Sequence, residues 1–476
     1  MSTVLTAIYF TNYDTQILEQ NVLDSKLSFC LTNLDDESRY IQKIRADIPN
    51  SLIGNYRDNL RINNSFLNLV WISVIALVFV ASGCSKTTQE PDLPTQDTRQ
   101  QVAAPQTALH ETPTPRPPDE EPVVPADNPP LLDKTVASVP LSEILFDTFR
   151  SGFVRLSEAS DSQIEDLRDR IQPIYSPTYD NAKGGDWLNS DDMVIGYEST
   201  DGGFAYPVKM LNLHELVNDV IDGEPVLISY CPLCASGVVY SRILDDQTLV
   251  FGNTSALYES DLVMFDHLTG SYWFQVLGEA IVGPLTGQRL KLLPSQTVPW
   301  GQWKQDHPNT QILSKDQGLL NSFFGNPYDR DSFDGYQSRV NRDQFAFPVS
   351  PDKLDSRLKS GDRVIAVQVG ETHRAYLLSG RPNEVINDEI EDTKIALFIR
   401  EDGPTGSAYF STSDETILTF AIDSGAITDN ETGSRWNFSG LATSGPLEGT
   451  KLEAVPSRTS FWFSLVGSLP DVELHP

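Results

Sequence analysis

The chain has 476 residues, enough for about three domains of average size. With 39% hydrophobic and 21% charged residues, it can form a packed core, which excludes a wholly disordered chain. The 66 acidic residues outnumber the 35 basic ones, for a net charge of −31. This balance argues against a nucleic-acid-binding surface, which needs clustered lysine and arginine. Four cysteines are too few for a scaffold held by disulfides.

An uncharged apolar run, 66–83, is long enough to cross a bilayer and also fits the core of a signal peptide. Its end, Ala81-Ser82-Gly83, is followed by Cys84, and this pattern resembles the lipobox of bacterial lipoproteins. We expect 61–84 to be a lipoprotein signal with Cys84 as the lipidation site; the alternative is an uncleaved signal anchor. Either one leaves residues 1–60 as a cytoplasmic tail or an over-extended gene start, and exports the rest.

Proline dominates the segment that follows. Eleven prolines fall within 85–130, among threonine, glutamine and acidic residues. Such a segment cannot bury enough apolar surface to fold, so 85–135 is predicted to be a disordered spacer. Residues 136–190 are predicted to form a helical lead-in, with helices at Leu141–Phe149 and Ser162–Ile171.

The remaining sequence repeats itself. The run from Thr269 to Ser295 matches the run from Thr432 to Ser457, including one tryptophan and one Gly-Pro-Leu-x-Gly turn in each. The shared glycines and prolines are typical of turns, and the shared tryptophan is typical of a core. We therefore expect two similar tandem modules, a first module at 191–316 and a second at 351–476, joined by a connecting segment at 317–350.

Short runs rich in β-branched and aromatic residues predict strands in the first module. They are Val194–Gly196, Pro225–Tyr230, Gly237–Leu244, Thr248–Gly252, Leu262–Asp266 and Tyr272–Leu277. Lys209–Ile221 differs, because its apolar residues recur every three to four positions and predict an amphipathic helix. The expected fold class is mainly β, or α+β: two similar β-rich modules with a few helices, behind a membrane tether.

Features that both modules share are expected to be architectural, whereas reactive residues in only one are candidates for function. Cys231 and Cys234 lie in the first module, in Tyr-Cys-Pro-Leu-Cys, and the second module has no cysteine. Apolar runs on both sides predict a strand–turn–strand unit, as in a zinc knuckle, rather than the helix start of a thioredoxin site. Such a turn aims both sulfurs at one point.

A metal site needs more ligands than two thiolates. His214 is the first choice and Met264 the next, because the second module has neither at the matching position. Thiolate with imidazole suits Zn²⁺, and thiolate with thioether suits Cu(I). The predicted site is therefore Cys231, Cys234, His214 and Met264, holding Cu or Zn. His267 is also confined to the first module but is more typical of a surface residue.

Two alternatives stay open. Cys231 and Cys234 could form the catalytic pair of a thiol–disulfide oxidoreductase, or a structural pair in a non-catalytic envelope binding protein. His214 would then bond to a nearby backbone carbonyl, and Met264 would fill the core. The sequence has neither a Walker loop nor a dinucleotide fingerprint, so no nucleotide cofactor is expected. Whether the protein is an enzyme is left open.

The stretch Val194–Ser314 resembles the bacterial and archaeal domain-of-unknown-function family 3179. The resemblance rests on several motifs: Ala205-Tyr206-Pro207, His214-Glu215-Leu216-Val217-Asn218-Asp219, Tyr230-Cys231-Pro232-Leu233-Cys234, Phe251-Gly252, Leu262-Val263-Met264-Phe265-Asp266, Ser271-Tyr272-Trp273, Gly283-Pro284-Leu285-Thr286-Gly287 and Trp300-Gly301-Gln302-Trp303. The end, Phe461-Trp462-Phe463, resembles the family's closing motif, which extends the likeness over residues 140–476.

The resemblance implies a fold family and an exported, often membrane-tethered context, with no established activity. It also implies that the histidine and the Cys-Pro-Leu-Cys motif occur together. This chain has His267 where the family usually has arginine. We expect an extracytoplasmic, membrane-anchored protein, in the periplasm or at the outer membrane, whose one expected partner is the membrane itself.

Overall fold

The computed structural model describes residues 123–149, 152–200, 202–317, 326–413 and 416–476. They belong to one compact unit, whereas the predicted tail and signal segment lie outside the described residues. In the described part, no helix has the length and apolarity needed to span a membrane.

Strands predominate among the described residues, which confirms the predicted fold class. The helical segments are short: α6 (Asp161–Leu167), α7 (Val208–His214), α8 (Trp300–Asp306), α9 (Tyr336–Val340), α10 (Trp462–Ser468) and the 3-10 turns η1 (Ala182–Gly185), η2 (Pro327–Asp329) and η3 (Pro351–Lys353).

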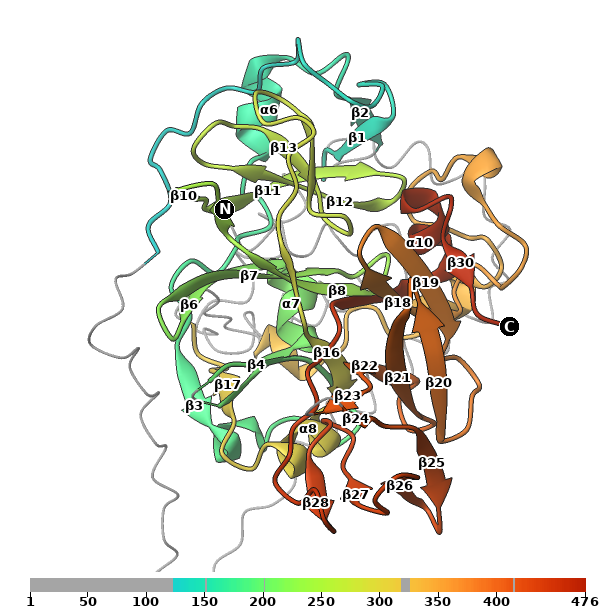
Figure 1. Cartoon of the computed structure of the whole chain (residues 1–476). Coiled ribbons are helices and arrows are strands. Elements are labelled where there is room, and N and C mark those ends of the chain that lie inside the picture. Colours follow the sequence, from blue (N-terminus) through green and yellow to red (C-terminus); the bar gives the residue numbers. More distant parts are fainter. Residues whose placement is uncertain (1–122, 150–151, 201, 318–325, 414–415) are drawn as a thin grey trace, which may run out of the picture. The chain divides into compact units, whose positions relative to one another are not determined.

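The largest sheet has eight strands and crosses the centre of Figure 1. Its order is β30 (Glu473–Leu474), β19 (Thr372–Leu377), β18 (Arg363–Val369), β29 (Ser457–Phe461), β8 (Ser236–Ser241), β7 (Glu224–Cys231) and β6 (Leu216–Ile221), with β15 (Leu292–Leu293) beside β8. Strands of both predicted modules therefore share one sheet. The contact is made where Thr459 of β29 pairs with Gly237 of β8.

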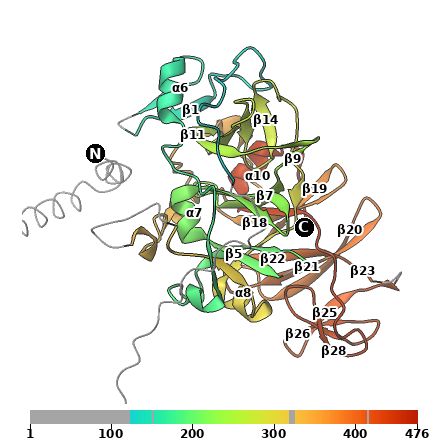
Figure 2. The same ribbon diagram turned by 90° about the vertical axis from the view of Figure 1, so that its left-hand side faces the viewer.

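Two further sheets lie above and below the central one in Figure 1, and Figure 2 shows the same order of layers from the side. The six-stranded sheet above runs β14 (Glu279–Val282), β13 (Tyr272–Phe274), β12 (Asp261–Asp266), β11 (Phe251–Tyr258), β1 (Ile144–Asp147) and β2 (Phe153–Arg155). The five-stranded sheet below runs β16 (Gln296–Pro299), β4 (Met193–Glu198), β5 (Gly203–Pro207), β17 (Gln311–Leu313) and β3 (Tyr179–Asn181).

The second module adds two smaller sheets. One is β20 (Glu384–Ile390), β21 (Thr393–Arg400) and β22 (Thr405–Phe410); the other is β25 (Phe420–Asp423), β26 (Ala426–Asp429), β27 (Arg435–Trp436) and β28 (Ala442–Ser444). Each module also has a two-stranded ribbon: β9 (Ile243–Leu244) with β10 (Gln247–Thr248), and β23 (Thr412–Ser413) with β24 (Thr416–Ile417).

One helix prediction was wrong, and another was wrong in part. Leu141–Phe149 contains the strand β1, although Ser162–Ile171 does contain most of α6. In Lys209–Ile221 only the first half is helical, because Glu215, with φ of 60°, ends α7 and the chain continues as β6. Both faces of β6 are largely buried, so its apolar residues do not alternate, and a helical spacing fits them equally well.

The folded part begins inside the segment that the composition assigns to the spacer. Leu132 is buried in a hydrophobic cluster that also holds residues of the six-stranded sheet and of α6. The backbone carbonyls of Pro129 and Pro130 accept hydrogen bonds from the Arg168 guanidinium. Ala137 then forms a bridge with Val282 of β14. Burial and hydrogen bonding to the rest of the fold thus begin before residue 136, and backbone pairing begins close to it.

The same strand pairings occur in both predicted modules. β4 pairs antiparallel with β16 and β5, and β17 joins β5 in parallel. In the second module, β18 pairs antiparallel with β29 and β19, and β30 joins β19 in parallel.

Side-chain bonds recur in the same way. The Asp266 carboxylate accepts hydrogen bonds from the backbone of Thr269 and the indole of Trp273. Asp429 accepts the same bonds from Thr432 and Trp436, at the same distances of 2.6 and 2.9 Å. Both tryptophans are buried, which fits the core role expected of them. Asp266 therefore closes a turn that the fold requires in both places.

Candidate metal centre

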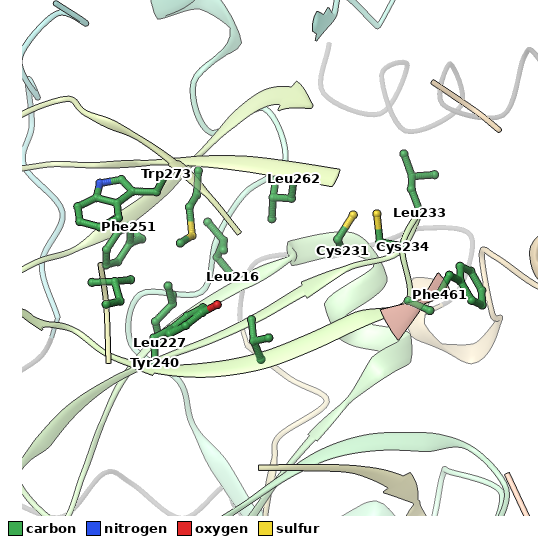
Figure 3. Packing of buried hydrophobic residues seen from close by; sticks show 14 of the residues in the cluster. Leu216, Leu227, Cys231, Leu233, Cys234, Tyr240, Phe251, Leu262, Trp273 and Phe461 are labelled. Carbon is green, nitrogen blue, oxygen red and sulfur yellow. The ribbon is translucent and has the colours of Figure 1, made fainter. Parts of the chain in front are cut away.

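The Cys-x-x-Cys segment forms the strand–turn–strand unit that the sequence predicts. β7 ends at Cys231 and β8 begins at Ser236. Inside the turn the Cys234 amide donates to the Cys231 carbonyl at 3.2 Å, and Ala235 has a φ of 49°. This tight turn places both thiols on the same side, as Figure 3 shows. Both are free thiols, at most 1% exposed, within one hydrophobic cluster.

A third ionisable group reaches the thiols from the six-stranded sheet. Asp261 is the first residue of β12, and the hairpin turn before it consists of Glu259 and Ser260, both with positive φ. One donor atom each from Cys231, Cys234 and Asp261 lies within 4.8 Å of the other two, and all three residues are buried. Two sheets thus contribute to one cluster, which we call the thiol–carboxylate cluster.

Sequence reasoning missed Asp261, although the comparison of the modules contains a signal for it. The hairpin of the first module extends from Phe251 to Asp266, whereas its counterpart extends only from Phe420 to Asp429. The two starting points are equivalent, because Asn218 bonds to the Phe251 backbone as Asn387 bonds to that of Phe420. The longer hairpin of the first module carries Asp261 to the cysteines.

Several contacts hold the tip of this hairpin in place. The Glu259 carboxylate accepts hydrogen bonds from the backbone and hydroxyl of Ser350 and from the ammonium of Lys353. The Cys234 thiol donates to the Ser260 carbonyl at 3.1 Å. The connecting segment and the Cys-x-x-Cys turn therefore clamp the tip from two directions.

The C-terminal helix α10 completes the surroundings. The Ser464 hydroxyl donates to one oxygen of Asp261 at 2.8 Å, and the Leu262 amide donates to the other at 2.7 Å. Just before α10, the Phe461 amide donates to the Cys234 carbonyl at 2.8 Å. The closing Phe-Trp-Phe motif thus lies beside the cysteines, although the two are more than 200 residues apart in the sequence.

Burial governs the charge of these groups. It raises the pKa of Asp261 to about 6, against the opposing effect of the Ser464 and thiol hydrogen bonds. Burial also raises the pKa of both cysteine thiols, and the nearby Asp261 charge acts in the same direction. A metal ion would reverse this pattern, because its charge stabilises thiolate and carboxylate together.

Glu215 is a second buried carboxyl near the cluster. Burial raises its pKa to about 8, whereas the Asn253 amide, which donates to it at 2.6 Å, acts against this shift. The Asp261 charge raises the Glu215 pKa further. Near neutral pH Glu215 is thus mainly protonated and adds little negative charge beside Asp261.

The structure does not bring His214 into the thiol–carboxylate cluster. Its Nδ1 bonds to the Gln172 carbonyl at 2.7 Å, and its Nε2 bonds to the Tyr328 hydroxyl at 2.6 Å. Burial lowers the pKa of the imidazole, so the neutral form predominates. Both ring nitrogens are therefore bonded outside the cluster. The bond to the Gln172 carbonyl agrees with the alternative in which His214 bonds to a nearby backbone carbonyl.

Met264 and His267 also lie outside the set of converging donors. Met264 is buried in the same hydrophobic cluster as the cysteines and is paired in the sheet with Asn253 and Trp273. His267 bonds to the Tyr175 hydroxyl at 3.1 Å, and burial lowers the pKa of its ring to about 4. His267 is 7% exposed, so it is buried rather than on the surface as expected. The predicted lipidation site, Cys84, lies outside the described residues.

The fold and the cluster together define a mostly β protein with a buried thiol–carboxylate cluster in its first module. The chain belongs to the family of proteins of unknown function DUF3179, whose pattern matches residues 168–471. This match confirms the resemblance seen in the motifs. No curated protein and no solved structure matches the chain.

Proposed function

We propose that the protein binds one Zn²⁺ ion through the thiolates of Cys231 and Cys234 and the carboxylate of Asp261. The observation that carries this proposal is the convergence of the three donor atoms, within 4.8 Å of one another and away from solvent. Two thiolates and a carboxylate are ligands that zinc accepts. Bound zinc would deprotonate both thiols, so that metal binding releases protons.

The oxygen ligand favours zinc over copper. Cu(I) prefers thiolates and thioethers, whereas Zn²⁺ also accepts carboxylate oxygen. The case for copper depends on Met264, whose surroundings are those of a core residue. His214, with both ring nitrogens bonded elsewhere, is not part of the proposed ligand set.

The metal would act first as a cross-link. Cys231 and Cys234 join two strands of the eight-stranded sheet, and Asp261 begins a strand of the six-stranded sheet. One ion bound to all three would tie these sheets together and to α10, through Ser464. Metal binding to the folded state alone stabilises that state by mass action.

Elemental analysis of the full chain, purified in detergent under reducing conditions, tests the proposal. We expect about one zinc per chain, because the cluster supplies a single set of converging ligands. The Cys231→Ser/Cys234→Ser variant and the Asp261→Asn variant should each lose most of it. A protein that takes up no zinc, or whose cysteine variant keeps it, would refute the proposal.

Two matched variants separate this ligand set from the one expected from the sequence. His214→Gln and Met264→Leu should each keep their zinc, since neither side chain belongs to the converging donors. Cobalt substitution gives a second readout, because cobalt bound to thiolates has a charge-transfer band, which the Asp261→Asn variant should largely lose together with the metal. Loss of zinc in the histidine variant would favour the original ligand set.

A thiol–disulfide oxidoreductase is the second candidate, and it is supported by the proximity of the two sulfur atoms, which lie within 4.8 Å of each other. Burial counts against it, because the raised thiol pKa leaves little thiolate to attack a disulfide. If this candidate is right, the metal-free protein should show a defined reduction potential and rapid reaction with a thiol reagent. A structural disulfide in a non-catalytic binding protein would instead resist reductant.

We also propose that the chain is an extracytoplasmic lipoprotein anchored through Cys84. The apolar run 66–83 and the lipobox-like residues before Cys84 support this. Metabolic labelling with an alkyne fatty acid should mark the wild-type protein but not the Cys84→Ser variant. Membrane attachment without any label would favour the signal anchor instead. In an oxidising compartment, bound zinc would protect the two thiols from disulfide formation.

A further inference from the structure

A cavity of about 220 Å³ lies against the Cys-x-x-Cys turn. Pro232 and Ala235 of the turn line it, whereas the two cysteines do not. Its other walls come from Asp191, Asp192 and Met193 at the start of β4, from α7, from the connecting segment around α9, and from the first residue of β18 and the last of β29. The cavity is smaller than the sites of drug-sized ligands and has room for about seven water molecules, so a ligand must be small.

Two hydrogen-bond donors face this cavity without a partner among the described residues. Tyr230 is 95% buried, lines the cavity, and its hydroxyl makes no hydrogen bond with any described residue. Arg363 packs over the Phe461 ring at 5.9 Å, and within the described part of the chain it has no carboxylate partner. Its charge lies close enough to Tyr230 to oppose the rise that burial causes in the phenol pKa.

The cavity is lined by further charged groups, one of which is a paired lysine and the others carboxylates. Lys209 is paired with Asp192 at 2.6 Å, so that its charge is balanced. Asp331, which accepts a hydrogen bond from Asn212 at 3.0 Å, and Asp334 bring two more carboxylates to the cavity from the connecting segment. Asp191 adds a further carboxylate from the segment before β4. The cavity thus combines one arginine and one neutral phenol with an acidic wall.

The fold itself does not require these donors. In the second module the position of Tyr230 is occupied by Ile399, as the equivalent strand pairings show. Arg363 begins β18 and pairs with Phe461, whereas its counterpart Met193 begins β4 and pairs with Pro299. An apolar residue therefore occupies each equivalent position, Ile399 for Tyr230 and Met193 for Arg363. The fold does not need the polar groups of Tyr230 and Arg363, which leaves them available to a ligand.

We propose that this cavity binds a small zwitterion of the size of a single amino acid. Arg363 and the Tyr230 hydroxyl hold the carboxylate, and Asp331 and Asp334 hold the ammonium group. A ligand with only a carboxylate would face the acidic wall, and one with only an amine would face the arginine, so both charges are needed. The proposal does not depend on zinc, because the cavity and the metal ligands have no residue in common.

Binding is tested on the full chain by thermal shift with each proteinogenic amino acid, followed by calorimetry with the one that stabilises most. We expect at least one amino acid to raise Tm. The corresponding carboxylic acid without the amine, and the amine without the carboxylate, should each bind at least tenfold more weakly. If no amino acid binds, or if the simple carboxylic acid binds equally well, the proposal is wrong.

Two variants identify the residues responsible. Arg363→Met inserts the residue of the other module and should weaken binding about tenfold or more, and Tyr230→Phe should weaken it about fivefold. Arg400→Met is the matched control, since Arg400 also lies over a phenylalanine ring, at 5.8 Å, but does not line the cavity. All three variants should keep their zinc. Unchanged affinity in Arg363→Met, with the metal retained, would overturn the assignment.

Discussion

Single side chains control the charge of the thiol–carboxylate cluster. Burial raises the pKa of Asp261 from 3.8 to about 6 and that of Glu215 from 4.5 to about 8. A carboxyl whose pKa is higher in the folded state stabilises the fold when protonated and loses that contribution as the pH rises. Without metal, both groups therefore weaken the fold on going from acid to neutral pH.

We predict that Asp261→Asn stabilises the metal-free protein at neutral pH relative to wild type, by on the order of 2–3 kcal/mol. The difference should grow between pH 4 and 6. Over this interval the Asp261 carboxyl is ionised in the unfolded chain, with its ordinary pKa of 3.8, but is still protonated in the folded protein, with a pKa of about 6. Urea unfolding at a series of pH values measures it, with Asp246→Asn on an exposed turn as the control. With zinc bound the sign should reverse, because the ion needs the ionised carboxylate.

Ser464 positions Asp261 from the far end of the sequence. Replacing it by alanine removes the 2.8 Å hydrogen bond to the carboxylate, and we expect zinc affinity to fall about 10–100-fold. Ser464→Thr, which keeps the hydroxyl, should restore most of it. Competition with a chelator gives the affinity. Ser468→Ala on the same helix should have no effect, and equal affinity in Ser464→Ala would show that the bond does not matter for the metal.

At the scale of elements, β8 packs closely against the five-stranded sheet at the residue where it pairs with the second module. A Cβ added at Gly237 would lie 2.9 Å from the Thr297 hydroxyl and 3.0 Å from the Ile195 side chain. Gly237 is also the residue that pairs with Thr459 of β29. The absence of a side chain at this position allows β8 to pack closely against β4 and β16 of the five-stranded sheet, at the residue where it also pairs with β29.

We predict that Gly237→Ala costs about 1–3 kcal/mol in the free energy of unfolding, because overpacking forces its neighbours to shift. Gly467→Ala is the matched control: its added Cβ would meet only Glu259, at 3.9 Å, and it lies in helix α10. Alanine there should stabilise the protein by up to about 1 kcal/mol. Equal denaturation midpoints for the two variants would contradict this account.

At the scale of the whole molecule, the two modules are not separate bodies. The eight-stranded sheet draws strands from both, and the Ser464–Asp261 bond joins the end of the chain to the first module. The Gln296 amide also donates to the Tyr409 hydroxyl of the second module at 2.9 Å.

The described part should therefore unfold in a single transition. Calorimetry should give equal calorimetric and van't Hoff enthalpies, because loss of either module removes the partner strands of the other. For the modules to unfold separately, β29 would first have to separate from β8, and α10 from Asp261. Two resolved transitions would instead mean that each module is stable alone.

Local patterns were enough to predict the strands around the cysteines and the turn between them. Pro225–Tyr230 and Gly237–Leu244 are apolar runs of strand length, and the four residues between the strands form a turn. The helix predicted at Lys209–Ile221 was wrong in its second half because a strand buried on both faces shows no alternation. In this segment no local pattern distinguishes a helix from a strand that is buried on both faces.

The amino-acid sequence by itself determined which residues are reactive and which module holds them: two cysteines in a tight turn, with no counterpart in the second module. Only the tertiary structure decided their third partner. His214 is nearer in the sequence but bonds to Gln172 and Tyr328, whereas Asp261 and Ser464 arrive from another sheet and from the C-terminal helix. The physical reason is that spacing along a chain sets local geometry, whereas contacts between distant segments depend on how buried sheets pack.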